Sequence, residues 1–294
     1  MKIIHSFWSK PSSEVNFLTE KFNGGWKHHK YFCMSWALSC LTFQKQYGEI
    51  ELITDIAGKK ILIDKLNLPY SNVRLDLEDL KNYPKELWAI GKIYSYMLQE
   101  EPFIHVDNDI YIWGKLGSEY ENAELVGQNL DLYEGHYHFA MNHLKELDFS
   151  FPHELVEDFK IQKKFKATNA GIIGGNNLDF FREFGDRSFW FIKKNLDKMN
   201  KTLIGSSYAL IYEQYFFSVL ARLYKTPIKH YISYEKDNNI ALNNFMRKYD
   251  EKKYVHLYGT TKSTFEACRE LELNLLVDFP TYHERIIKYL NNGE

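Results

Sequence analysis

The sequence predicts an α/β fold, with a mostly parallel, mixed central sheet flanked by helices. Short apolar runs alternate with segments of helical period, an order typical of parallel strands joined by crossover helices. The apolar runs end in polar residues, which parallel strands would gather along one edge of the sheet: Ser6, Asp55, Asp76 and Asp107. With 294 residues and 45% hydrophobic content, the chain can bury a full core.

The first hundred residues are expected to alternate strands and helices. Apolar side chains recur at helical spacing between Leu87 and Met97, which predicts the last of these helices. The expected elements are a strand over 2–8, a helix over 28–47 that ends near Gly48, a strand over 50–53, a helical stretch around 61–66, a strand near 72–75 and a helix over 85–99.

The remaining residues continue the alternation. The expected elements are strands at 124–127, 167–173 and 254–257, helices near 136–147, 178–199 and 207–224, and two closing helices. No repeat, low-complexity tract or linker interrupts the chain. We therefore expect one domain over 1–294.

Composition excludes several classes of protein. Lys and Arg number 37 against 39 Asp and Glu, so no global positive field favours nucleic acid. Cys33, Cys40 and Cys268 show no metal-type spacing, which favours reduced thiols. No apolar run reaches 18 residues, and the N-terminus has no signal-peptide pattern. We expect a cytoplasmic protein without a transmembrane segment.

The most informative segment is residues 102–113, where an apolar run ends in Asp107 and Asp109 and a second run follows. In extended backbone, residues two apart point to the same side, so both carboxylates can bind one cation. Two oxygen ligands leave most of a Mg²⁺ or Mn²⁺ coordination sphere open for water and phosphate. A chance Asp-x-Asp on a surface loop is the alternative, but unpaired carboxylates inside an apolar stretch are costly. The pattern predicts a metal site that handles a diphosphate.

A second candidate segment begins at Asn169, with glycines at 171, 174 and 175. Several glycines in a strand indicate close approach of the backbone to a ligand or to another strand. The Asn169 amide can donate and accept, which suits sugar hydroxyls. A simple bulge or turn before the next helix explains the same pattern equally well.

A third segment ends in His256, Gly259 and Lys262. Ser263 with Glu266 matches a capping box, which predicts a helix that begins at Ser263. The residues before it would then lie at a helix N-terminus, where phosphate oxygens bind readily. His256 could supply a nitrogen ligand to Mn²⁺. A hydrogen-bonded core histidine is the alternative.

Glu213 and Gln214 interrupt the helical pattern of 207–224, and Lys92 interrupts that of 85–99. Charged residues on helices are usually solvated, and this is the alternative for Glu213 and Lys92. Lys92 could reach a phosphate if its helix borders the site.

Taken in order, these motifs resemble those of A-type glycosyltransferases, the nucleotide-diphospho-sugar transferases, and most closely uncharacterised bacterial members. Residues 2–8 resemble the first strand of that family, residues 105–109 its Asp-x-Asp motif and residues 169–171 its Asn-Ala-Gly segment. Residues 256–262 match its His-x-x-Gly-x-x-Lys ending, and Glu213 with Gln214 stands where the glycogenin-like members have Asp-Gln. The resemblance spans about residues 2–265 as ordered motifs. Glu in place of Asp at 213 is one departure, and Ser263-Thr264 after the lysine is another.

The resemblance implies a nucleotide-binding half at 1–115, an acceptor and donor-sugar half at 116–294, and roles for these positions. Asp107, Asp109 and His256 would bind Mn²⁺ or Mg²⁺ at the donor diphosphate. Asn169, Glu213 and Gln214 would act at the donor sugar, near its anomeric carbon. The residues expected to bind the nucleotide and its diphosphate are Ser6, Phe7, Trp8, Asp55, Lys92, Asn108, Gly259 and Lys262.

The leading hypothesis is metal-dependent transfer of a hexose from a nucleotide diphosphate sugar, expected to be UDP-linked, to a hydroxyl acceptor. A glycan, lipid, small molecule or peptide is compatible as the acceptor. Retention at the anomeric carbon follows from the glycogenin-like resemblance alone, whereas inversion would need a carboxylate base such as Glu213. A metal-dependent phosphohydrolase or nucleotidyltransferase is an alternative, and so is a non-catalytic partner protein that binds nucleotide sugars.

Overall fold

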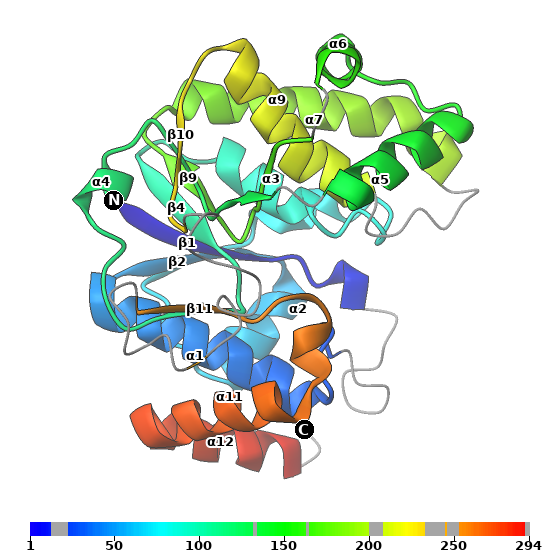
Figure 1. The fold of residues 1–294 in the computed structure, drawn as a ribbon. Coiled ribbons are helices and arrows are strands. Elements are labelled where there is room, and N and C mark those ends of the chain that lie inside the picture. The colour runs from blue at the N-terminus through cyan, green and yellow to red at the C-terminus, as the bar shows by residue number, and fades with distance from the viewer. Residues whose placement is uncertain are drawn as a thin grey trace. The chain divides into compact units, whose positions relative to one another are not determined.

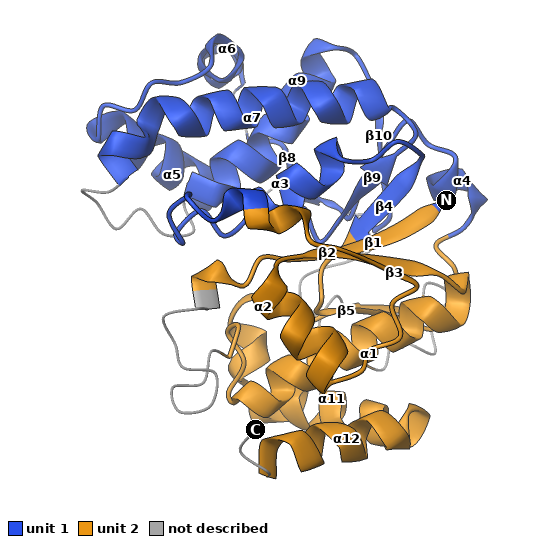
Figure 2. Cartoon of the chain, turned by 180° about the vertical axis from the view of Figure 1, so that it is seen from behind, with its two compact units in different colours: residues 1, 79–105, 117–234 blue, residues 2–78, 106–116, 235–294 orange. Residues whose placement is uncertain are grey.

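The computed structural model forms two compact units that interleave in the sequence (Figure 2). Unit 1 holds residues 1, 79–105 and 117–234, and unit 2 holds residues 2–78, 106–116 and 235–294. The predicted halves at 1–115 and 116–294 stay a prediction. The structure describes residues 1–12, 23–131, 134–162, 165–199, 208–232, 245 and 253–291.

Seven strands form a mixed, mostly parallel sheet flanked by helices, which confirms the predicted fold class (Figure 1). Their order is β10-β6-β9-β4-β1-β2-β3. The pairs β1–β2, β2–β3 and β10–β6 run parallel, whereas β6 and β9 run antiparallel. The bounds are β1 Lys2–Phe7, β2 Ile50–Thr54, β3 Asn72–Arg74, β4 Phe103–Val106, β6 Leu125–Gly127, β9 Ile172–Gly175 and β10 Ile228–His230.

In unit 2, helix α1 (His29–Tyr47) packs against α11 (Phe265–Asp278) and α12 (Pro280–Asn291). Every residue of α1 from Phe32 to Phe43 is buried, because the helix is covered on all sides. Gly48 ends α1 with a φ of 82°, and its N–H bonds the Gln44 carbonyl. The helix end predicted at Gly48 is therefore confirmed.

Unit 1 contains α3 (Ile90–Met97), which packs against α7 (Leu178–Met199). Gly185 permits this contact, since a Cβ there would lie 2.1 Å from the Met97 Cγ. The predicted helix over 85–99 is shorter, because tight turns join Leu87 to Pro84 and Ile90 to Leu87 ahead of α3.

Two further predictions for unit 1 need correction. The strand expected over 167–173 is split into β8 (Ala167–Thr168) and β9, because the Asn169 side chain accepts the Gly171 N–H at 2.9 Å and closes a turn. The helix expected over 207–224 is not α-helical throughout: a π-helical stretch, η4 (Leu210–Tyr215), precedes α9 (Phe216–Leu223). A π-helix has a wider turn than an α-helix and often marks a functional site.

The remaining elements are short or peripheral. Across the residues that the structure describes, no helix combines the length and apolar character that crossing a bilayer requires. The three cysteines are buried and free, as expected, and the cytoplasmic location stays a prediction. The elements are η1 Lys10–Ser12, α2 Ile56–Lys59, η2 Lys60–Lys65, η3 Asp76–Leu80, β5 Ile110–Ile112, α4 Ser118–Glu121, β7 Leu130–Asp131, α5 Glu134–Glu146, α6 His153–Ile161, β11 Tyr254–His256 and η6 Gly259–Ser263.

Candidate functional site

A tight turn in unit 2 presents the predicted carboxylates. β4 ends just before Asp107, and the Ile110 N–H donates to the Asp107 carbonyl at 3.1 Å, so that the chain turns and begins β5. The Ser35 hydroxyl of α1 donates to the Asn108 carbonyl at 2.8 Å. The buried helix therefore holds the turn that carries Asp109.

A two-stranded ribbon brings the histidine to this turn. β11 pairs antiparallel with β5 and sets His256 opposite Ile110. The Leu257 N–H also donates to the Asp109 carbonyl at 3.0 Å. As a result, the His256 Nε2 lies 3.2 Å from the Asp109 Oδ1. One ligand atom each from Asp107, Asp109 and His256 lies within 4.8 Å of the other two.

A short 3-10 turn, η6, carries Lys262 to the same carboxylate. Gly259 opens this turn with a φ of 58°, in the left-handed region that favours glycine. The Lys262 Nζ lies 2.5 Å from the Asp109 Oδ2, and its side chain is 17% exposed. Both oxygens of Asp109 therefore face a positively charged or nitrogen-bearing group.

The start of α11 differs from the prediction by one residue. The Thr264 hydroxyl accepts the Ala267 N–H at 3.2 Å, so Thr264 is the N-cap, not Ser263. Ser263 belongs to η6, where its hydroxyl donates to the Thr260 carbonyl. Lys262 still lies just ahead of a helix N-terminus, as predicted.

The electrostatics of Asp109 favour the ionised form. Burial alone would raise the pKa of this carboxyl, but Lys262 and His256 beside it outweigh burial and hold the pKa well below its usual range. Asp109 therefore stays negative over the whole physiological range of pH.

The donor set fits a divalent cation. Among the described atoms, the buried His256 Nδ1 has no hydrogen-bond partner, and the buried Asp109 Oδ1 has only the ion-pair contact with the His256 Nε2 at 3.2 Å. Buried polar atoms are normally satisfied, so such atoms at a cluster of two carboxylates and an imidazole indicate room for a ligand. Carboxylate oxygens with one imidazole nitrogen suit Mn²⁺ and, with more oxygen ligands, Mg²⁺.

The residues predicted to bind the nucleotide near β1 differ in their surroundings. Ser6 is half-buried, whereas Phe7 and Trp8 are buried, and the Phe7 ring packs 5.1 Å from that of Trp36. The buried phenylalanine therefore contributes to packing whether or not it also contacts a nucleotide.

Asp55 joins the end of β1 to the start of α2. Its Oδ1 accepts the Gly58 N–H at 2.7 Å and thereby caps α2. Its Oδ2 accepts the Ser9 N–H at 2.7 Å and the Ser9 hydroxyl at 2.9 Å. These bonds give Asp55 a structural part in holding the loop after β1, and its predicted contact with a nucleotide stays a prediction.

The predicted residues of unit 1 form a second polar cluster. Glu213 is fully buried in η4, and the Lys92 Nζ lies 3.1 Å from its Oε1. The Lys92 side chain is 14% exposed. The interpretation of these two residues as solvated side chains on helix surfaces is therefore wrong. Gln214 is half-buried, and its amide contacts the Tyr137 hydroxyl at 2.9 Å.

Unit 1 also holds amides that the sequence reasoning missed. Gln128 and Asn129 follow β6, and the Asn169 N–H donates to the Asn129 carbonyl at 3.0 Å. Gln128 is fully buried, and its amide donates to the Asn129 side chain. The rule that polar residues after a strand mark a sheet edge, applied to 124–127, would have found both.

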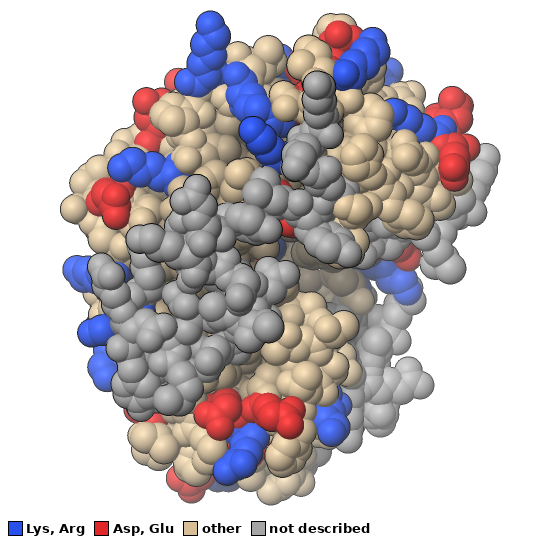
Figure 3. Space-filling view, viewed as in Figure 1, with Lys and Arg blue, Asp and Glu red and all other residues tan. Residues whose placement is uncertain are grey.

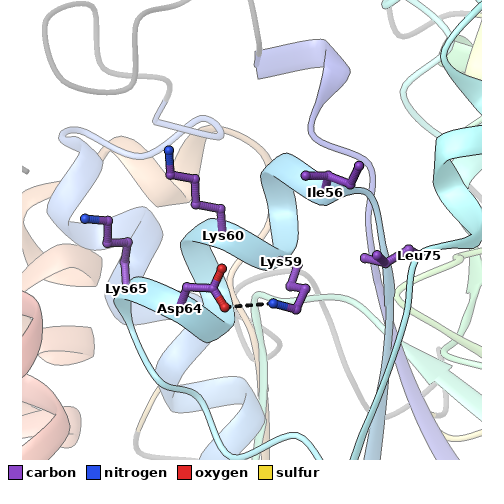
Figure 4. Close-up of a pocket in the computed structure, with 6 residues that line it drawn as sticks. All are labelled: Ile56, Lys59, Lys60, Asp64, Lys65 and Leu75. Atoms are coloured by element: carbon purple, nitrogen blue, oxygen red, sulfur yellow. Dashed lines mark hydrogen bonds and ion pairs between the residues drawn. The ribbon is translucent and has the colours of Figure 1, made fainter.

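A separate open pocket of about 550 Å³ lies in unit 2 (Figure 4). One ion pair crosses it, from the Lys59 amine to the Asp64 carboxylate at 2.9 Å. None of the predicted site residues lines this pocket, whose walls are Ile56, Lys59, Lys60, Asp64, Lys65 and Leu75. Acidic and basic side chains are interspersed on the face in Figure 3, in line with the formal net charge of −2.

A protein family matches residues 1–289 and is described as a family of unknown function, DUF6734. The chain belongs to this family. A search of curated proteins finds no match. Because the description of DUF6734 assigns no reaction, the chemistry has to be argued from the residues themselves.

Among solved structures, this DUF6734 chain is similar to several glycosyltransferases. An active-site mutant of LgtC shares 12% identity over 92% of this chain and 95% of that one, with a TM-score of 0.46. The bifunctional WbbM shares 14% identity over 98% of this chain and 51% of that one, with a TM-score of 0.47. GlyE of Streptococcus pneumoniae TIGR4 shares 11% identity over 96% of this chain and 63% of that one, with a TM-score of 0.40. LgtC is a galactosyltransferase, and GlyE and WbbM are glycosyltransferases.

Proposed function

We propose that the protein is a metal-dependent glycosyltransferase that moves a hexose from a nucleotide diphosphate sugar, UDP-linked, to a hydroxyl acceptor. The observation that carries the proposal is the convergence of Asp107, Asp109 and His256, whose ligand atoms lie within 4.8 Å of one another. Transfer of a sugar leaves a nucleoside diphosphate, whose negative charge must be stabilised as the glycosidic bond breaks.

The residues of unit 2 suit this requirement. Asp107, Asp109 and His256 would hold Mn²⁺ or Mg²⁺, which when bound supplies Lewis-acid stabilisation of the departing diphosphate. Lys262 would add a second positive charge beside the metal, since its amine lies 2.5 Å from the Asp109 Oδ2. Lys262 lies in the short turn η6, which directly precedes the N-terminus of α11, and a helix N-terminus favours the binding of phosphate. In the same proposal, Gly259 and Asn108 border the diphosphate.

We assign the nucleotide to the end of the first strand. Ser6, Phe7 and Trp8 would border the base and ribose, and Asp55 would hold that loop through Ser9. The hydrogen bonds from Ser9 support this role for Asp55, since they tie the loop to the adjacent helix.

In unit 1, Asn169 and Gln214 are proposed to contact the donor sugar. The burial of Glu213 and its ion pair with Lys92 support retention over inversion, because an inverting base must reach an acceptor hydroxyl. In this proposal Lys92 acts through Glu213, with its amine held at 3.1 Å from the carboxylate.

The experiment is a screen of nucleotide sugars with Mn²⁺, read by release of the nucleoside diphosphate and by transfer to added acceptors. We expect turnover with a UDP-sugar and a loss of about a hundred-fold or more in Asp109→Asn, the scale for removing one group that stabilises transition-state charge. Asp64→Asn is the matched control, because that carboxylate lies at an exposed ion pair.

The alternatives give different results. A phosphohydrolase or nucleotidyltransferase would release phosphate or diphosphate, or transfer a nucleotidyl group, without moving sugar. A partner protein that only binds would gain thermal stability with Mn²⁺ and UDP but show no turnover. Absence of any binding heat with saturating Mn²⁺ and UDP would contradict the proposed function and the binding-only alternative.

A further inference from the structure

Gln214 differs from its neighbours in η4. Glu213 and Tyr215 on either side are buried, whereas Gln214 is half-buried. The end of its amide lies 2.9 Å from the hydroxyl of Tyr137 on α5. One end of the Gln214 amide, either its oxygen or its nitrogen, therefore contacts Tyr137, and the other end is left for a ligand.

Tyr137 is a fixed partner. It is fully buried, and its ring stacks on Phe165 at 6.0 Å between centroids with an angle of 20°. On another side its ring lies 6.2 Å from that of Tyr215. Packing on these sides fixes the orientation of the Tyr137 ring, so only the hydroxyl hydrogen is free to rotate.

The Tyr137 hydroxyl has two oxygen neighbours but one hydrogen. It lies 3.1 Å from the Asp131 Oδ2 as well as 2.9 Å from the Gln214 Oε1. An ionised carboxylate can only accept, whereas an amide can turn over and donate its N–H. Both contacts are satisfied when the hydrogen goes to Asp131 and the amide of Gln214 turns to donate to the Tyr137 oxygen.

We propose that Tyr137 and Asp131 are positioning residues that set the direction of the Gln214 amide, so that its carbonyl oxygen points away from Tyr137 and toward the donor sugar. The consequence for the sugar rests on the proposed function. Positive charge develops at the anomeric carbon as the leaving group departs, and a carbonyl oxygen stabilises that charge whereas an NH₂ group does not.

The phenol keeps its hydrogen under all relevant conditions. Burial raises the pKa of Tyr137 well above its usual value, and the neighbouring Asp131 carboxylate raises it further. The chain of bonds from Gln214 through Tyr137 to Asp131 therefore has a fixed direction in neutral solution.

The first test measures the direction of this chain without any activity. Gln214→Glu places a second acceptor beside the single hydroxyl hydrogen, and we expect the unfolding midpoint to fall by roughly 2–4 °C. Adding Asp131→Asn should restore most of this loss. The new amide at position 131 can donate to the Tyr137 oxygen, and the Tyr137 hydroxyl can then donate to the new carboxylate at position 214. In a Tyr137→Phe background the restoration should shrink, since only charge repulsion remains to be relieved.

Two results would overturn the proposal. If Gln214→Glu alone leaves the midpoint unchanged, the hydroxyl donates to Gln214 in the native protein. If Asp131→Asn raises the unfolding midpoint of Gln214→Glu by the same amount in the Tyr137→Phe background, the Tyr137 hydroxyl does not couple positions 131 and 214.

The second test concerns catalysis. We expect Tyr137→Phe to lower kcat about ten-fold with little change in the donor KM, the pattern of a misaligned group rather than of lost binding. A loss confined to KM would overturn the positioning role. If the wild-type protein transfers no sugar at all, the proposed function fails, while the unfolding measurements still decide the direction of the amide.

Discussion

Each unit of the molecule places a buried carboxylate beside a lysine among its candidate site residues, and the two pairs differ in what surrounds them. In unit 2 the Asp109 side chain is 5% exposed and pairs with Lys262, and in unit 1 the Glu213 side chain is 0% exposed and pairs with Lys92. The lysines are 17% and 14% exposed. By charge and burial alone, the two pairs are alike.

The surroundings separate them. Within the described part of the chain, only the group of Asp107, Asp109 and His256 brings three potential metal ligands together. It lies on a turn between strands, whereas Glu213 lies within a helix next to the buried Tyr212. A lysine partner stabilises either carboxylate, but only the turn also offers further ligands. We conclude that the pair in unit 2 suits exchange with a cation, and the pair in unit 1 suits a permanent ion pair.

The largest expected effect comes from breaking the pair in unit 1. Lys92→Met leaves the Glu213 carboxylate buried without its lysine, and we expect the free energy of unfolding to fall by about 3 kcal/mol. Urea unfolding of unmodified and variant protein measures this loss. Lys59→Met is the control, because the Lys59–Asp64 pair is exposed and should contribute less than about 1 kcal/mol. Equal losses in the two variants would contradict a permanent buried pair.

The two pairs also show which parts of the site can be predicted from the sequence. The convergence of Asp107 and Asp109 was predicted from extended backbone, whereas in the structure a tight turn between β4 and β5 brings the two carboxylates together. Lys92 and Glu213 are far apart in sequence, and a charge on a helix is solvated by default, so their pairing needed the packing of unit 1. The N-cap at Thr264 was missed by one residue, because a 3-10 turn can occupy the residues in front of a capping motif.

The fold was predicted to a similar depth. Strands such as β1 and β2 followed from buried apolar runs, and Gly48 fixed the end of α1. The pairing of β5 with β11 was not predicted, although it brings His256 to Asp109. Pairing between distant short strands depends on tertiary packing and leaves little trace in either strand alone.

A second prediction compares one buried histidine from each unit. Burial lowers the pKa of His5 in unit 2 to about 3 and that of His230 in unit 1 to about 4. Below pH 6.5 these histidines bind protons in the unfolded chain but stay neutral in the folded protein. The free energy of unfolding therefore falls as the pH drops from 6.5 toward these values. Both folded-state pKa values lie below 5, so each histidine should lower the stability at pH 5 by about 2 kcal/mol, and the two should differ only at lower pH.

Urea unfolding at pH 7 and pH 5 tests this loss. His5→Gln and His230→Gln should each reduce the stability difference between the two pH values by a similar amount, about 2 kcal/mol. The imidazole of His5 accepts or donates to the Tyr70 and Ser39 hydroxyls, and glutamine can serve both neighbours. A pH difference that stays the same in His5→Gln would contradict the assignment.

A third prediction concerns the exchangeable pair. Because Lys262 competes with a divalent cation for the Asp109 carboxylate, Lys262→Met should tighten Mn²⁺ binding about ten-fold in the absence of nucleotide, or about 1.4 kcal/mol. Titration calorimetry measures the affinity. Lys92→Met is the matched control and should leave it unchanged, since Lys92 pairs with Glu213. Weaker Mn²⁺ binding in Lys262→Met would mean that the lysine supports the metal rather than competes with it.

The smallest expected effect separates the units through their helix caps. Asn177 caps α7 in unit 1 by accepting the Phe180 N–H at 3.1 Å, and Thr264 caps α11 in unit 2 by accepting the Ala267 N–H at 3.2 Å. Each change to alanine should lower the free energy of unfolding by about 1 kcal/mol. Only Thr264→Ala should also weaken the binding of UDP with Mn²⁺, because Thr264 directly follows the turn that carries Lys262. Calorimetry on both variants decides the point: if Asn177→Ala weakens nucleotide binding as much, the loss reflects general stability, and the turn ahead of α11 has no special part in holding the diphosphate.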